Sequence, residues 1–358
     1  MRVGLVIYGS LDTLSGGYLY DRMLVERLQA DGDKVEIISL PGKSYLANLK
    51  DNFSAGLLRC LQTMQVDVLL EDELNHPSLW RINHLLQEKA RYPIVSIVHH
   101  LRCSESRPAW QNRVIAMLER RYLSSVDAFV FNSQTTRQVV ENLAGVSQPS
   151  VVAYPGGDRL HPSISEVQIA VRAIQSGPLR IFFLGNLIPR KGLQILLQAL
   201  SRLPQDAWML TVAGSLEMDR GYASAILRQV RSARLESQVH FLGPLKDAEL
   251  MEQFLFNQVL AVPSSYEGFG IAYLEGMGFG LPAIATTQGA ACEIIASGEN
   301  GYLVSPDDPR ELAECLLQLA EDRELLLRLS LGAHQHFKDH PTWEQTTVRI
   351  RDFLLEMT

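Results

Sequence analysis

Short apolar runs alternate with longer amphipathic segments along the chain. The runs are VGLVIY, KVEIISL, VDVLLE, PIVSIV, DAFVFN and SVVAY in the first half, and LRIFFLG, WMLTVAG, VHFLG, VLAVPS and PAIAT in the second. Runs of this length are typical of buried strands, and the segments between them, such as 191–203 and 222–235, have helical spacing. Alternating strands and helices predict an α/β fold, with parallel sheets covered by helices on both faces.

One break interrupts this alternation. The segment YPGGDRLHPSISE is rich in Pro, Gly and Ser, and it predicts a linker near 154–178. A chain of 358 residues also exceeds what one hydrophobic core usually supports. We therefore expect two domains, 1–160 and 161–340, that face each other across a cleft. Ligands of such sheets lie beyond the carboxyl ends of the strands, so the cleft is the expected site.

Composition and charge exclude some classes of function. The chain is 46% hydrophobic and 20% charged, as expected for an ordinary soluble globular protein. Its net charge is -7, and because residues 1–160 hold 17 basic and 17 acidic side chains, all the excess acid lies in the second half. An acidic protein lacks the cationic surface that phosphate backbones require. We exclude nucleic acid as a partner.

Cysteine usage and the first residues bear on the compartment. Cys60, Cys103, Cys292 and Cys315 show no C-x-x-C pair, which argues against a zinc site or a disulfide framework. The opening MRVGLVIYGSLD has too short an apolar run for a signal sequence and is better interpreted as a strand. No stretch reaches the roughly 18 apolar residues of a membrane span. A cytoplasmic protein is expected.

The stretch SSYEGFGIAYLEGMGFGLP, 264–282, carries Glu267 in a glycine-rich turn and Glu275 eight positions later. A helix is expected to begin near Phe269 or Gly270, and its free amides and positive dipole end would attract phosphate. Glu275 would lie roughly 9 Å further along this helix and lean back toward its start. Two carboxylates around a phosphate site fit a nucleotide sugar, which carries hydroxyls on both sides of its diphosphate.

A second strand-loop-helix unit, FLGNLIPRKGLQILLQAL at 183–200, places Arg190 and Lys191 just before a helix. Two cations at a helix N-terminus oppose the dipole unless an anion binds there, and a diphosphate would supply one. Structural alternatives stay open for both units. Glu275 and the two cations could be solvated side chains, and the glycines could serve packing.

The second half resembles the nucleotide-binding domain of the retaining glycosyltransferases of family 4, which have the GT-B fold of two Rossmann-like domains. The matching pieces are LGNLIPRKG, VAGS, HFLGPL, VPSSYEGFGIAYLEGMGFGLPAIATTQGAACEII, NGYLVSPDD and ELAECLLQLAED, between 180 and 322. The resemblance implies that Glu267 contacts donor-sugar hydroxyls, Glu275 the ribose and Lys191 the diphosphate. Asn186 departs from the pattern because the family carries an Arg there, and Arg190 is the candidate to compensate.

The first half matches the family more weakly. SGG at 15–17 would place Gly16 and Gly17 in a loop against the diphosphate or the sugar, and IVHHLRCSE places two histidines after a strand. The family has a His near the donor sugar, which favours His99, while His100 and Glu105 are candidate acceptor contacts. An ordinary turn, a buried structural histidine and a surface carboxylate are the alternatives. Three further residues are expected to be structural: Asn132, Ser133 and Asp158.

These parts imply a hexosyltransferase that uses a nucleotide-diphosphate sugar, with a UDP-sugar slightly favoured over GDP-mannose. By resemblance the reaction retains anomeric configuration and needs no metal or other cofactor, and Glu267 binds the sugar rather than attacking it. Charge developing on the leaving diphosphate would be stabilised by fixed cations and helix amides. The catalytic candidates are His99, Glu267, Arg190 and Lys191, and the donor-binding candidates are Gly16, Gly17, Asn186, Gly268, Phe269, Gly270, Ile271 and Glu275.

Other functions are weighed against this one. A nicotinamide dehydrogenase is disfavoured because GSLDTLSGG is not G-x-G-x-x-G and the end of the second strand, EIISLPG, has no clean ribose-binding acid. A non-catalytic module that binds sugar nucleotides would keep the phosphate clamp without acceptor chemistry, and the histidines argue mildly against it. EDE at 71–73 imitates an acidic metal motif but has no flanking ligand pattern, so no metal is expected.

The acceptor is the least determined partner. Residues 101–121 hold five arginines against two glutamates, with apolar side chains among them. Such a basic amphipathic helix suits an anionic membrane surface, although solvated arginines explain it equally. A lipid-linked acceptor with peripheral membrane contact therefore stands beside a glycan or a small molecule. The last segment, 341–358, is predicted to be an amphipathic helix that, by resemblance, crosses back to the first domain.

Overall fold

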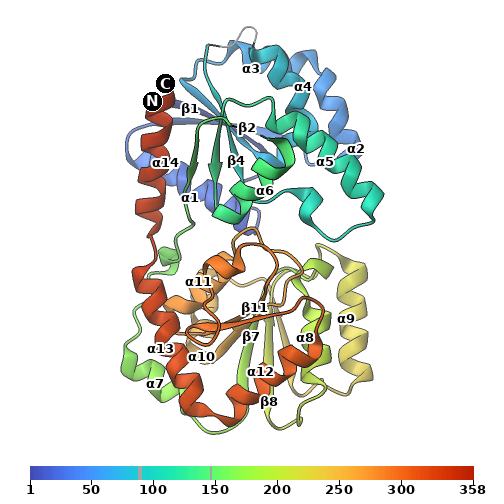
Figure 1. The fold of residues 1–358 in the computed structure, drawn as a ribbon, viewed down its shortest axis with the longest axis vertical. Coiled ribbons are helices and arrows are strands. Elements are labelled where there is room, and N and C mark those ends of the chain that lie inside the picture. Colours follow the sequence, from blue (N-terminus) through green and yellow to red (C-terminus); the bar gives the residue numbers. More distant parts are fainter. Residues whose placement is uncertain (88–90, 146) are drawn as a thin grey trace. The chain divides into compact units, whose positions relative to one another are not determined.

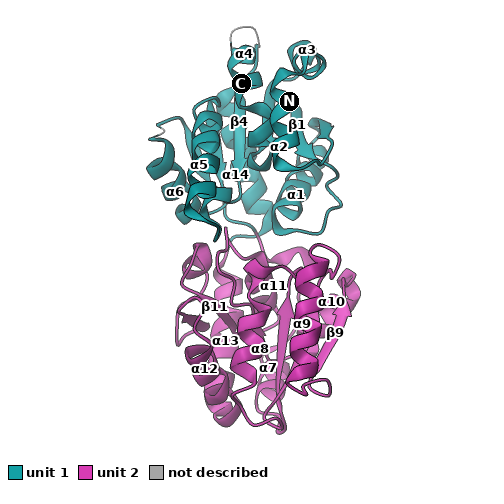
Figure 2. Ribbon diagram, turned by 90° about the vertical axis from the view of Figure 1, so that its right-hand side faces the viewer, with its two compact units in different colours: residues 1–155, 341–358 teal, residues 156–340 magenta. Residues whose placement is uncertain are grey.

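The computed structural model describes residues 1–87, 91–145 and 147–358, which form two compact units. Unit 1 comprises residues 1–155 and 341–358, and unit 2 comprises residues 156–340 (Figure 2). Each unit holds a six-stranded parallel sheet with helices packed around it (Figure 1). The predicted α/β fold with two Rossmann-like domains is confirmed.

The sheet of unit 1 has the strand order β2-β1-β3-β4-β5-β6. All five residues of β3 and of β4 are buried, because these central strands are covered on both faces, whereas the edge strand β2 is largely exposed. The strands are β1 (Arg2–Tyr8), β2 (Lys34–Leu40), β3 (Val68–Asp72), β4 (Ile94–Val98), β5 (Ala128–Phe131) and β6 (Ser150–Val152). The α-helices are α1 (Gly16–Ala30), α2 (Tyr45–Asn48), α3 (Ala55–Thr63), α4 (His76–Gln87), α5 (Ala109–Leu123), α6 (Gln134–Ala144) and α14 (Trp343–Met357), with 3₁₀ turns η1 (Leu49–Phe53), η2 (Glu73–Asn75) and η3 (Arg102–Ser104).

The sheet of unit 2 has the strand order β12-β11-β10-β7-β8-β9. Its core contains Trp208 and stacked phenylalanines, with the rings of Phe254 and Phe279 5.2 Å apart. The strands are β7 (Leu179–Leu184), β8 (Trp208–Ala213), β9 (Val239–Gly243), β10 (Val259–Ala261), β11 (Ala283–Thr286) and β12 (Gly301–Val304). The α-helices are α7 (Glu166–Ala173), α8 (Leu193–Leu200), α9 (Arg220–Ser232), α10 (Asp247–Phe256), α11 (Ile271–Gly278), α12 (Pro309–Glu321) and α13 (Arg323–Asp339), with 3₁₀ turns η4 (Asp158–Leu160), η5 (Pro189–Lys191) and η6 (Ala290–Glu293).

The last helix, α14, packs on α1 in unit 1, and the two chain ends lie near each other (Figure 1). Asp33 joins them, because it accepts from the N-terminal amine at 2.6 Å and from Nε of Arg351 at 2.7 Å. The hydroxyl of Thr346 also donates to the carbonyl oxygen of Tyr154. The C-terminal segment is therefore an integral part of unit 1.

The predicted linker at 154–178 is wrong in part, because it contains the helix α7. Ser165 caps the start of this helix, and Oε1 of Gln168 accepts from the backbone amide of Ser165 at 2.9 Å. This capping box was the signal that the Pro and Ser content of the segment obscured.

Among the described residues, no helix is long and apolar enough to cross a membrane.

Candidate active site

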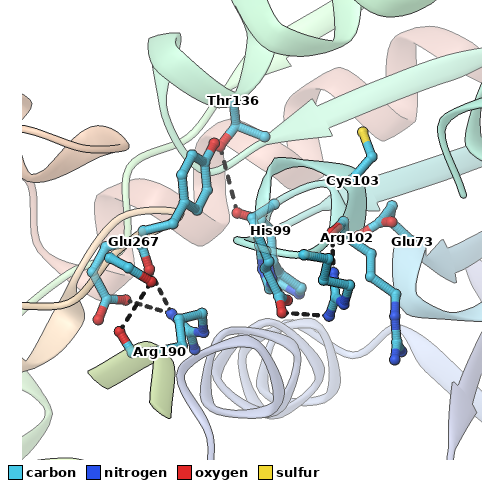
Figure 3. A network of polar contacts seen from close by, with 12 residues as sticks. Glu73, His99, Arg102, Cys103, Thr136, Arg190 and Glu267 are labelled. Atoms are coloured by element: carbon cyan, nitrogen blue, oxygen red, sulfur yellow. Dashed lines mark hydrogen bonds and ion pairs between the residues drawn. The ribbon is translucent and has the colours of Figure 1, made fainter. Parts of the chain in front are cut away.

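Glu267 lies in the turn between β10 and α11, where two cations, Lys191 and Arg190, approach its carboxylate. Figure 3 shows Arg190 beside Glu267. Lys191 Nζ and Ser264 Oγ each donate to Oε1 at 2.6 Å, and an Arg190 nitrogen lies 3.5 Å from Oε2. Burial would raise the pKa of Glu267, but Lys191 and Arg190 outweigh it and lower that pKa to about 2. Burial lowers the pKa of Lys191, and Glu267 opposes that change. An ionised Glu267 between two cations leaves a net positive charge in this turn.

The loop that carries these cations is fastened to the turn that carries Glu267. The amide of Ser265 donates to the carbonyl oxygen of Arg190 at 2.8 Å, and the Arg190 guanidinium donates to the carbonyl oxygen of Tyr266 at 2.7 Å. Gly192 ends η5 with φ at 74°, and a Cβ on it would lie 2.0 Å from the carbonyl oxygen of Pro263. The sequence R-K-G therefore brings both cations to the end of β10 because glycine permits that approach.

The helix α11 begins at Ile271, close to the predicted start. Its N-cap residue, Gly270, has φ at 104° and provides no side-chain cap for the first amides of the helix. Phe269 and Ile271 on either side of Gly270 are buried. A helix start without a side-chain cap presents donors and a positive dipole end, which is the chemistry that phosphate oxygens need.

Glu275 lies on α11 and is buried, but it already has a cationic partner. Nε of Arg159 donates to Oε1 of Glu275 at 2.9 Å, and Arg159 also donates to Asp247 at 2.5 Å. Burial raises the pKa of Glu275, and Arg159 partly offsets this. Arg159 was not singled out from the sequence, because it lies 116 positions from Glu275 and outside every recognised motif. A ribose at Glu275 would share this carboxylate with Arg159.

Asn186, which stands where an arginine was expected, joins two loops. Its Oδ1 accepts from the amide of Ser215 at 3.1 Å, which links the segments that follow β7 and β8. Gly214 allows this contact, because a Cβ there would lie 2.0 Å from the carbonyl oxygen of Gly185. Asn186 therefore holds together the loops that follow β7 and β8. The positive charge expected from an arginine at this position comes instead from Arg190 and Lys191.

His99 follows β4 in unit 1 and is only 6% exposed. Its carbonyl oxygen accepts from Nδ2 of Asn132 at 2.8 Å and from the hydroxyl of Thr136 at 3.4 Å (Figure 3). Its Nε2 lies 3.1 Å from Oδ1 of Asp21 on α1. Burial would lower the pKa of His99, but Asp21 and Asp72 raise it to about 9. Asn132 therefore has the structural role predicted for it, and Asp21 is a partner that the sequence motifs did not indicate.

Gly16 and Gly17 are the first residues of α1 and not part of a loop, while their contact with the donor stays a prediction. The hydroxyl of Ser15 accepts from the amide of Tyr18 and starts the helix there. A Cβ on Gly17 would lie 3.0 Å from Cδ2 of His99, so this glycine makes room for the imidazole. Of the other residues expected to be structural, Ser133 caps α6 and Asp158 lies in η4.

The two acceptor candidates lie close together. Nε2 of His100 is 3.0 Å from Oε1 of Glu105, and Arg107 donates to the other oxygen of Glu105 at 2.6 Å. All three side chains are between 20% and 23% exposed, so a ligand could reach them from solvent. Arg107 is the member of this cluster that the sequence did not single out.

The EDE segment contributes to two buried clusters. Among the described residues, Asp21, Asp72 and His99 bring ligand-type atoms within 4.8 Å of one another, and Glu73, His76 and Glu119 do the same. In the second set, Nδ1 of His76 lies 3.0 Å from the carbonyl oxygen of Glu73, which can only accept. When Nδ1 donates to this oxygen, the lone pair of the ring lies on Nε2, 2.9 Å from the hydroxyl of Tyr45. Burial lowers the pKa of His76 to about 4.

Comparison with known proteins places these features in a family. Residues 20–159 match the family model described as Glycosyltransferase Family 4, and residues 165–336 match the one described as Glycosyl transferases group 1. The chain belongs to glycosyltransferase family 4. The resemblance of the second half to this family is thereby confirmed. The family match and the named relatives support glycosyltransferase activity, without specifying the donor or the acceptor.

Several relatives of this glycosyltransferase have names or structures. The D-inositol 3-phosphate glycosyltransferase of Corynebacterium efficiens is 25% identical over 314 residues, which cover 81% of this chain and 72% of that protein. Sucrose-phosphate synthase of Thermosynechococcus elongatus has a TM-score of 0.84 at 18% identity, covering 99% of this chain and 98% of the other. HepE of Anabaena, solved with UDP and glucose, has a TM-score of 0.78 at 20% identity and covers 99% of both chains. The structural matches confirm the GT-B fold.

Proposed function

We propose that this glycosyltransferase moves a hexose from a UDP-sugar to a hydroxyl acceptor, with retention of configuration and without a metal. The observation that carries the proposal is the cluster of Lys191, Arg190 and Glu267 beside the uncapped start of α11. One carboxylate and two cations leave a surplus positive charge, which suits a diphosphate. The carboxylate itself suits the hydroxyls of the sugar attached to that diphosphate.

In the proposed mechanism Lys191 turns from Glu267 toward the diphosphate as the donor binds. Negative charge grows on the leaving diphosphate, and Lys191, Arg190 and the amides at the start of α11 stabilise it in a partly water-excluded turn. Glu267, ionised at neutral pH because its pKa lies near 2, then accepts from sugar hydroxyls. The acceptor hydroxyl enters on the face that the diphosphate leaves, which preserves the anomeric configuration. No protein group forms a bond to the sugar.

The choice of UDP is supported by HepE, which has been solved with UDP-glucose and shares this fold. The test is incubation with a panel of UDP- and GDP-sugars, followed by measurement of slow hydrolysis and of the anomeric form of the product. Lys191→Met should abolish turnover, whereas Lys338→Met, at an exposed pair with Glu166, should not. Turnover of a GDP-sugar alone would correct the donor. Binding without turnover of any donor, across a panel of acceptors, would favour a non-catalytic module.

We also propose that α5 contacts a membrane that carries a lipid-linked acceptor. Trp110, Val114 and Met117 are 66%, 48% and 48% exposed, and their spacing places them on one face of this helix. Arg120 and Arg121 already have protein partners, the carbonyl oxygen of Leu143 and the ring of Trp80. The proposal therefore depends mainly on the exposed apolar side chains of Trp110, Val114 and Met117, and less on the number of arginines in α5.

Sedimentation with phosphatidylcholine vesicles, with and without phosphatidylglycerol, tests this contact. Trp110→Ala should reduce the bound fraction, while Leu355→Ala, at an apolar position of α14 that is 44% exposed, should not. Equal sedimentation with and without vesicles would leave a glycan or a small molecule as the acceptor.

A further inference from the structure

We propose that Asp21 and Asp72 act as a buried acid pair that positions His99, with one proton shared between the two carboxyl groups. Asp21 accepts from Nε2 of His99, and the pair keeps the second proton of the imidazole on its other nitrogen, Nδ1, which then acts as a hydrogen-bond donor. The inference rests on the proposed function and on the expectation from the family resemblance that His99 lies near the donor sugar. It assigns roles to Asp21, which no sequence motif indicated, and to Asp72, which the EDE segment suggested only as a metal ligand.

The topology of unit 1 brings the three side chains together. Asp72 is the last residue of β3, His99 follows the neighbouring strand β4, and Asp21 lies on α1. Asp21 and Asp72 are fully buried, and one atom of each side chain lies within 4.8 Å of the others in the set. Parallel strands end at the same edge of a sheet, which is why residues 27 positions apart can meet there.

The hydrogen bonds of the two carboxyl groups are incomplete. Oδ1 of Asp72 accepts from the amide of Leu74 at 2.9 Å, and Oδ1 of Asp21 faces His99 at 3.1 Å. The second oxygen of each, Oδ2, is buried and has no hydrogen-bond partner among the described residues. Two buried carboxylates this close cannot both stay ionised without a large cost. One proton on the pair removes one of the two charges.

The charges around the pair agree with this assignment. Burial, and then the charge of Asp21, raise the pKa of Asp72 to about 8, so Asp72 is the neutral member at pH 7. Asp21 faces His99, and its charge is the largest of those that raise the pKa of the imidazole. Glu73 also faces His99 and adds to the rise of its pKa to about 9, despite burial. The imidazole is therefore doubly protonated at neutral pH, and Nδ1 donates.

Packing fixes the ring in this orientation. The ring of Tyr20 meets that of His99 edge-on, with centroids 5.3 Å apart, and Tyr20 is itself held by a 2.8 Å hydrogen bond to the carbonyl oxygen of Ala153. Gly17, on the same helix as Tyr20, also lies close to the ring, so that a Cβ on it would be 3.0 Å from Cδ2. With the His99 carbonyl held by Asn132 and Thr136, only side-chain torsions could turn the ring. A carboxylate that fixes an imidazole in this way sets its orientation and charge without touching the substrate.

Isosteric variants separate the roles of the two acids. Asp21→Asn removes the charge that holds the second proton on His99. The acid dissociation constant of the imidazolium should therefore rise at least a hundredfold, which makes His99 neutral at pH 7. Asp72→Asn imitates the protonated acid because its amide can donate to Asp21, so His99 should stay protonated. Asp352→Asn, the same substitution at an exposed position of α14, is the matched control.

The readout is ¹⁵N–¹H NMR of histidine-labelled protein without substrate, combined with steady-state kinetics on a UDP-sugar. Asp21→Asn should lower kcat at least tenfold and change the donor KM less than threefold. The inference is overturned if wild-type His99 is neutral at pH 7, if Asp21→Asn leaves its titration unchanged, or if Asp72→Asn makes it neutral. Stoichiometric Zn²⁺ binding that Asp72→Asn abolishes would instead make the cluster a metal site and also overturn it.

These readouts separate the inference from the function on which it rests. The NMR titration needs no substrate, so the predicted pattern with no sugar transfer would leave the acid pair intact and overturn the proposed function. Sugar transfer with a neutral His99 would do the reverse. If Asp21→Asn does not fold, the wild-type and Asp72→Asn titrations still decide between a shared proton and two ionised acids.

Discussion

Replacing Glu267 by glutamine tests the charge balance of the site most directly. Gln is the same size and keeps an oxygen that Lys191 and Ser264 can reach, so the change removes charge with little change of shape. In the folded protein the pKa of Glu267 is about 2, against an ordinary value of 4.5. That difference corresponds to about 3 kcal/mol of folding free energy at pH 7. The side chain is 10% exposed, so solvent screens little of this amount.

The sign of the pH dependence follows from the direction of the shift. Because the pKa of Glu267 is lower in the folded state, its contribution is present above the unfolded pKa and is lost as the pH falls toward 2. Glu267→Gln should therefore reduce the free energy of unfolding by about 3 kcal/mol at pH 7, and by about 1 kcal/mol less than that at pH 4. The destabilisation is thus largest near neutrality.

Urea unfolding followed by circular dichroism at pH 7, 5 and 4 measures this difference, with the exposed Glu252→Gln of α10 as the matched control. A destabilisation that is equal at all three pH values would refute the ionic account of Glu267. The same variant should bind UDP at least as tightly as the wild type, because Lys191 is released from its carboxylate. It should transfer sugar roughly 10- to 100-fold more slowly, since a hydrogen bond to a charged group is worth about 1.5 to 3 kcal/mol.

Further predictions concern the rest of the site. Glu275→Ala should raise the donor dissociation constant about tenfold or more, at roughly 1.5 to 3 kcal/mol for each ribose hydrogen bond to the charge; titration calorimetry checks this, and unchanged affinity in a folded variant would remove Glu275 from the ribose site. Gly17→Ala should lower kcat while changing the unfolding midpoint little, because the new Cβ would lie 3.0 Å from Cδ2 of His99; unaltered kcat would contradict the role of the ring. Activity should survive EDTA, and a complete loss that Mg²⁺ or Mn²⁺ restores would revive the EDE segment as a metal site. If the donor is contacted by Glu267 and also by Gly16, Gly17 and His99, saturating donor should reduce the radius of gyration in small-angle scattering; an identical profile, with binding confirmed independently, would mean that no closure occurs.

Local sequence patterns were sufficient for the elements of the fold and for one part of the site. The strand runs, the helices α8 and α9, and the start of α11 all follow from periodicity, glycine positions and length. Arg190, Lys191 and Glu267 were recognisable because each sits in a short strand-turn-helix unit whose chemistry is visible within a few residues. The helix α7 was missed although its capping box is local, because Pro and Ser content dominated the interpretation of that segment.

By itself the sequence determined the alternation of strands and helices, the family and the cations at the end of β10, because these depend on spacing within a segment. Only the tertiary structure decided that Arg159 pairs with Glu275 across 116 positions and that Asp21 faces His99 across 78. It also decided that Gly17 lies in the helix α1, where the absence of a side chain leaves room for the His99 ring. The physical reason is that strand order determines which carboxyl ends become neighbours, and periodicity along the chain carries no information about that order. Burial then sets the charge states, because a carboxylate or an imidazole takes its pKa from side chains that the sequence places far away.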